Sequence, residues 1–117
     1  MAYDSATVYA TRDKYMDFAG IDLNEEFKNS NTDNPTRAVA LFIKNLTTWT
    51  YTHLNAHYDL ESDLWDDDTF TQALMWQIKH TLTHGEDGKL DKTAYSIMHS
   101  YGMIVQAGAG RYTGAWR

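Results

Sequence analysis

Two pairs of histidines stand four residues apart, at His53/His57 and at His80/His84. On a helix this spacing places both imidazoles of a pair on one face, as in helices that bind a metal ion. The pairs read His-Leu-Asn-Ala-His and His-Thr-Leu-Thr-His, so neither has the glutamate that the zinc-protease motif requires after its first histidine. Both pairs also fall near expected helix ends, where an imidazolium interacts well with the helix dipole. A structural role is therefore the preferred interpretation, and a helical metal-binding protein stays open as an alternative.

Three consecutive carboxylates, Asp66, Asp67 and Asp68, are the other group with possible chemistry. Neighbouring residues on a helix do not face one another, and acids in a first turn are explained by the positive end of the helix dipole. Gly108-Ala-Gly110 lacks the preceding strand and the lysine of a phosphate-binding loop. No nucleophile stands in a recognisable pattern with a base. We therefore expect a protein that is not an enzyme, with no catalytic, cofactor-binding or metal-ligating residue.

The overall charge restricts the classes of partner. The 117 residues contain 10 Lys and Arg and 16 Asp and Glu, which gives a formal net charge of −6. Proteins that bind nucleic-acid phosphates or anionic membranes need clustered positive charge, so this net negative charge argues against both classes. The chain has no cysteine, which excludes disulfides and thiolate metal sites. Its longest apolar run, Ala38–Ile43, is far shorter than the roughly 20 residues of a membrane-spanning helix, and Met-Ala-Tyr-Asp does not begin a secretory signal.

Capping residues and apolar spacing predict an all-α fold, a small bundle of three main helices plus a short N-terminal helix. Thr11 caps the short helix and Gly20 ends it, and Ile21–Phe27 adds one more turn. Asn34-Pro35 begins a main helix that runs to His57. The others are expected from Asp68 or Thr69 to His84, ended by Gly85, and over Lys92–Tyr101, capped by Asp91 and ended by Gly102. Residues 11–103 form the domain, between an extended N-terminal arm (1–10) and an extended C-terminal arm (104–117).

The C-terminal arm differs in composition from the rest of the chain. It contains three glycines and no acid. Aromatic residues beside arginines are typical of anchors at protein interfaces. The candidate partner-binding residues are accordingly Arg111, Tyr112, Trp116 and Arg117.

The order of these elements resembles a known family. The chain has a short helix over Thr11–Gly20, a long helix, an acidic linker, a second long helix of the form Phe70-x-x-Ala73-x-x-x-Gln77…Gly85, a small helix and an aromatic tail. This pattern, over about residues 11–103, is similar to the head–tail connector (adaptor or head-completion) proteins of long-tailed bacteriophages. The chain departs from the family after Gln77, where an aromatic residue is common and Ile78, Lys79 and His80 stand here.

The resemblance implies a structural virion protein of the neck, made in the host cytoplasm. Such proteins form rings, typically of twelve copies, under the portal protein, extend the DNA channel without specific DNA binding and dock the next neck or tail protein. Acids would suit the channel wall, because they repel DNA phosphates; Asp59–Asp68 is the candidate lining. The main alternative is a small acidic inhibitor or regulator that binds a basic protein partner.

Overall fold

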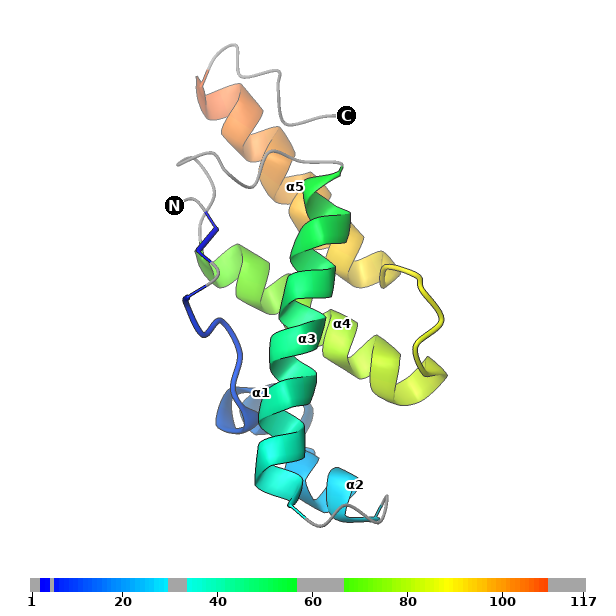
Figure 1. The fold of residues 1–117 in the computed structure, drawn as a ribbon. Coiled ribbons are helices and arrows are strands. Elements are labelled where there is room, and N and C mark those ends of the chain that lie inside the picture. The colour runs from blue at the N-terminus through cyan, green and yellow to red at the C-terminus, as the bar shows by residue number, and fades with distance from the viewer. Residues whose placement is uncertain (1–2, 5, 30–33, 57–66, 110–117) are drawn as a thin grey trace.

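The computed structural model describes residues 3–4, 6–29, 34–56 and 67–109, and over these ranges the chain forms five helices and no strand. They are α1 (Arg12–Ala19), α2 (Leu23–Asn29), α3 (Pro35–Asn55), α4 (Asp67–His84) and α5 (Lys92–Ala109) (Figure 1). The all-α fold predicted from the sequence is thus confirmed. None of the described helices is both long enough and apolar enough to cross a membrane.

The helix boundaries follow from capping residues. The Thr11 hydroxyl accepts a hydrogen bond from the Lys14 N–H, and the Asn34 side chain accepts one from the Arg37 N–H. Gly20 ends α1 in the left-handed region, at φ 71°, and donates its N–H to the Met16 carbonyl. Asp91 caps α5, because its carboxylate accepts hydrogen bonds from two successive backbone N–H groups. These predicted caps are confirmed, and residues Ile21–Phe27 fall largely within α2.

The predicted end of α5 at Gly102 is wrong, because α5 continues to Ala109. A glycine inside a helix costs only about 1 kcal/mol relative to alanine. The next residues, Met103-Ile-Val-Gln-Ala107, continue the helix. The first six residues of the expected C-terminal arm, 104–109, are therefore helical, and residues 110–117 lie outside the described part of the chain.

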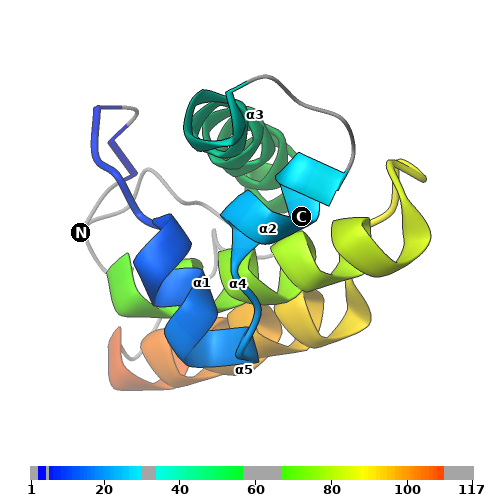
Figure 2. The ribbon, with the colours of Figure 1, turned by 90° about the horizontal axis from the view of Figure 1, so that it is seen from below.

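Helix α4 lies at the centre of the fold and contacts α1, α3 and α5. Seen from below, α3 lies on one side of α4 and α5 on the other, while α2 lies against α3 (Figure 2). Apolar residues of α4 therefore face more than one neighbour. Its buried residues are Phe70, Ala73, Leu74, Met75, Gln77 and Ile78.

The N-terminal segment packs on this core. Tyr9 and Ala10 are buried, and Tyr3 stacks on Tyr51 of α3 with ring centroids 3.7 Å apart. The Tyr9 ring meets Phe70 of α4 edge-on at 5.0 Å, and the Tyr9 carbonyl accepts a hydrogen bond from the Thr71 hydroxyl. The sequence predicts an extended arm here, but the described segment is not extended throughout. It contains a turn closed by a hydrogen bond from the Thr7 N–H to the Asp4 carbonyl at 3.0 Å, and it packs on α3 and α4.

Arg12 and Asp22 join the starts of α1 and α2. The Arg12 Nε and Nη2 donate hydrogen bonds to the two carboxylate oxygens of Asp22, each at 2.7 Å. The Arg12 guanidinium, together with the backbone N–H of Asn24, holds the pKa of the Asp22 carboxyl below its ordinary value. This ion pair fixes the short connection through Gly20.

Two buried tyrosines allow a matched test of the core. The Tyr9 hydroxyl accepts a hydrogen bond from the Asp4 N–H at 2.8 Å, whereas the buried Tyr15 hydroxyl has no partner among the described residues. We expect Tyr9→Phe to lower the free energy of unfolding by about 1 kcal/mol and Tyr15→Phe to raise it by a similar amount, because an unpaired buried hydroxyl keeps its desolvation cost. Chemical denaturation measures both; an equal loss in the two variants would contradict this expectation.

The Arg12–Asp22 pair predicts a pH dependence. Because the pKa of Asp22 is lowered on folding, its contribution to stability is complete above the ordinary value of 3.8 and is lost as the pH falls through the lower folded value. Arginine stays charged throughout. The difference in unfolding free energy between the wild type and Asp22→Asn should therefore be constant from pH 5 to 7 and shrink below pH 4. Arg12→Gln should remove most of this dependence, and a difference that grows in acid would show the sign to be wrong.

Candidate functional site

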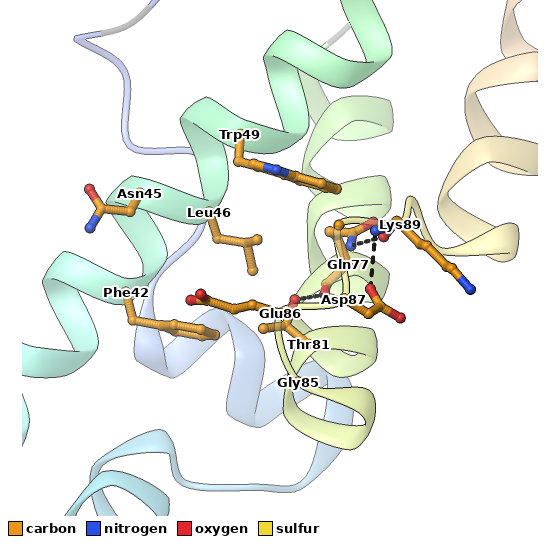
Figure 3. A pocket seen from close by; sticks show the side chains of 11 residues that line it. Phe42, Asn45, Leu46, Trp49, Gln77, Thr81, Gly85, Glu86, Asp87 and Lys89 are labelled. Carbon is orange, nitrogen blue, oxygen red and sulfur yellow. Dashed lines mark hydrogen bonds between the residues drawn. The ribbon is translucent and has the colours of Figure 1, made fainter.

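A pocket of about 400 Å³ lies between α3 and the turn that joins α4 to α5 (Figure 3). We call it the α3–turn pocket. Helix α3 supplies one wall, and α4 with the turn supplies the other. Its lining residues are Phe42, Asn45, Leu46, Trp49, Gln77, Thr81, Gly85, Glu86, Asp87, Gly88 and Lys89.

The side chain of Gln77 holds the turn in place. It is 1% exposed, its Nε2 donates a hydrogen bond to the Lys89 carbonyl at 3.0 Å, and its Oε1 accepts one from the Asp91 N–H at 2.7 Å. Both bonds bridge α4 to the residues just before α5. The apolar spacing of α4 places Gln77 on the inward face, but its role as a polar clamp was not predicted. A single amide in an otherwise apolar stripe is the signal that could have indicated it, because a buried amide needs partners.

Two glycines make the turn tight. Gly85 and Gly88 have φ values of 77° and 72°, a region that other residues rarely adopt. Gly85 donates its N–H to the Thr81 carbonyl and so ends α4 as predicted. The Asp87 carboxylate accepts a hydrogen bond from the Lys89 N–H, which closes the turn locally. The backbone that carries Glu86 is thus held on both sides.

The α3 wall of the pocket is apolar and aromatic. The Trp49 indole lies across the pocket beside Leu46, and Phe42 lies one turn further along α3 (Figure 3). The His53 ring stacks on the indole with centroids 3.8 Å apart and an interplanar angle of 25°. His53 Nδ1 also donates a hydrogen bond to the Trp49 carbonyl at 2.8 Å, so the ring that covers one indole face is itself fixed.

Glu86 is the charged side chain that points into the pocket. Its carboxylate reaches from the turn towards Phe42 and Leu46, whereas the Asp87 and Lys89 side chains point away from α3 (Figure 3). Within the described ranges the Glu86 carboxylate forms no hydrogen bond or ion pair. The pocket therefore combines an aromatic wall with a negative charge that no described side chain neutralises.

His80 also links α4 to the turn, through its contacts with Asp87 and Asp91. Its Nε2 donates to the Asp87 carboxylate at 2.9 Å, and its Nδ1 lies 3.4 Å from Asp91 Oδ1. The bond from His80, and then the N–H of Lys89, hold the pKa of the Asp87 carboxyl below its ordinary value. The His84 ring lies 4.8 Å from that of His80. His80 is therefore engaged in holding the turn.

The histidine pairs do not assemble into a metal centre where the chain is described. His53 is engaged with Trp49, and His57 lies outside the described residues. Over residues 3–4, 6–29, 34–56 and 67–109 there is no group of three or more His, Asp or Glu side chains placed to hold a metal ion. Asp67 and Asp68 stand in the first turn of α4, where they suit the helix dipole, while Asp59–Asp66 fall outside the described part.

The predicted partner-binding residues Arg111, Tyr112, Trp116 and Arg117 also lie outside the described residues. They stay a prediction. A second hollow, of about 820 Å³, runs between the N-terminal segment and the first half of α3, with Val8 at its edge 69% exposed. It is lined mainly by apolar and hydroxyl side chains.

Comparison of the chain with models of known protein families, with curated proteins and with solved structures found no match. The geometry and the sequence are therefore the grounds for a function.

The Gln77 clamp can be tested with a control on the same helix. Gln77→Leu should lower the free energy of unfolding by about 3 kcal/mol, because it leaves the Lys89 carbonyl and the Asp91 N–H without partners. Gln72→Leu, at an exposed position of α4, should change it by less than about 0.5 kcal/mol. Denaturation gives both values, and hydrogen exchange should show faster exchange of the Asp91 amide in Gln77→Leu. Equal stability of the two variants would refute the clamp.

Proposed function

We propose that this chain is a structural assembly protein of the head–tail connector type. In this proposal it forms a ring between the phage portal and the next neck or tail protein and extends the DNA channel. The observation that carries the proposal is the order of the helices. The short capped α1, the long α3 and the second long α4 ending at Gly85 come in the order on which the resemblance rests, with α2 between α1 and α3. Helix α5 comes next as the resemblance implies, but it has 18 residues, as many as α4, where a small helix is expected.

The surface of the domain offers further support. The α3–turn pocket has an aromatic wall and a charged rim, a combination typical of sites where an interface anchor is received. The turn beside it is held by Gln77 and His80, so it would enter an assembly already ordered. Binding to a surface that is already ordered avoids the entropy cost of immobilising a loop.

The proposed docking element is the tail that comes after α5. Helix α5 ends at Ala109, and the first candidate residue, Arg111, comes two residues later. In this proposal Arg111, Tyr112, Trp116 and Arg117 contact the portal or the next neck protein.

Negative-stain microscopy and mass measurement test this function. With a purified portal ring from the same genome, the full chain should add a ring-shaped layer, and the added mass should correspond to about twelve copies. Removal of residues 110–117 should abolish this binding and leave the helical circular-dichroism signal unchanged, because all five described helices lie within residues 12–109.

Two outcomes would count against the proposal. Absence of any layer on the portal with the full chain would refute the connector function. Loss of the helical signal on trimming would show that the tail belongs to the core of the domain and would refute its assignment as the docking element.

A further inference from the structure

We propose that the α3–turn pocket is a binding site for an arginine side chain presented by a partner protein. The proposal names one chemical feature of a partner, and it holds whether or not the chain assembles into a ring. It rests on three features of the pocket: the carboxylate of Glu86, the indole of Trp49 and the apolar wall between them.

The first feature is the direction of Glu86. Although the residue is exposed, its carboxylate turns towards the apolar wall of α3 (Figure 3). No cation of the described chain meets it there. Lys89, the nearest in sequence, points away from α3, and Lys79 lies over the Trp76 ring, 5.1 Å from its centroid. The pocket therefore has an anionic group ready for a cation from outside.

The second feature is the indole of Trp49, which is half-buried and lines the pocket. His53 stacks on one face of the indole and fixes its orientation, and the indole lies across the pocket (Figure 3). A tryptophan face attracts a cation within about 6 Å of its centroid. Trp49 and Glu86 line the same pocket, so in this proposal the indole and the carboxylate act on the same bound cation.

The third feature selects arginine over other cations. Leu46 and Phe42 lie beside the route to Glu86 and offer contact for an aliphatic stem (Figure 3). A planar guanidinium can stack on an indole and at the same time donate two hydrogen bonds to one carboxylate, which an ammonium cannot do. A volume of about 400 Å³ accommodates a side chain, not a folded element.

The net negative charge of the chain also favours a partner that presents an arginine. A net charge of −6 attracts a basic polypeptide and raises its rate of encounter. The direct contact with the cation depends on Glu86. The long-range attraction and the direct contact can therefore be separated by experiment. Neutralising any acid weakens the long-range attraction slightly, whereas neutralising Glu86 removes the direct contact.

The test uses the full ¹⁵N-labelled chain and two blocked peptides, acetyl-Gly-Ala-Arg-Ala-Gly-amide and its citrulline analogue, which has the same shape without the charge. The arginine peptide should shift the Trp49 indole N–H and the Glu86 amide signals with a Kd of about 1 mM. The citrulline peptide should bind at least about ten-fold more weakly, and added salt should weaken binding of the arginine peptide.

Matched variants locate the site. Glu86→Gln and Trp49→Leu should each weaken binding of the arginine peptide by about ten-fold or more. Asp17→Asn, which removes one exposed carboxylate from α1, should change its Kd by less than about two-fold. Thermal unfolding of each variant shows whether its fold is intact. The Glu86 variant changes an exposed residue of a turn that Gln77 holds, so its fold should be retained.

Three results would overturn the proposal. These are equal binding of the arginine and citrulline peptides, unchanged binding to Glu86→Gln, and signal shifts confined to residues outside the pocket. Self-association of the unliganded chain that Glu86→Gln abolishes would identify a second copy as the source of the cation and would refute a separate partner. Failure to bind a portal ring affects none of these readouts.

Discussion

The buried amide of Gln77 is the contact on which the second half of the molecule depends. It is a polar group in a stripe of apolar side chains, and its cost of burial is offset because both of its ends find backbone partners just before α5. Those bonds set where the chain reverses and therefore how α5 lies against α4. They also present Glu86 to α3. Both the packing of α5 against α4 and the position of Glu86 in the pocket therefore depend on the Gln77 side chain.

Short-range features were predictable from the sequence. Thr11, Asn34 and Asp91 cap helices because their side chains satisfy N–H groups within three residues, and Gly20 and Gly85 end helices through local backbone freedom. Gly102 shows the limit of this reasoning. The same residue type ends a helix or sits within one according to the residues after it, and here those up to Ala109 continue α5.

Long-range features were not predictable. Nothing near Tyr9 in the sequence indicates that its ring meets Phe70 or that its carbonyl bonds Thr71, because those partners are about sixty residues away. The pocket could not be predicted for the same reason. Trp49 and Glu86 come from separate elements, and the crossing of α3 over α4 brings them together. The histidine pairs, which the spacing made prominent, serve in packing and turn closure where they are described.

The Tyr3–Tyr51 stack and the Tyr9–Phe70 contact have a consequence for synthesis on the ribosome. Tyr3 and Tyr9 leave the exit tunnel before α3 and α4, and they can bury their rings only after α4 has been made. The nascent chain therefore exposes these aromatic surfaces while α3 is translated, and its folding is completed late rather than from the leading end. Early capture of that segment by a chaperone, or its blockage by a bulky fusion, would act on the whole domain and not on a dispensable appendage.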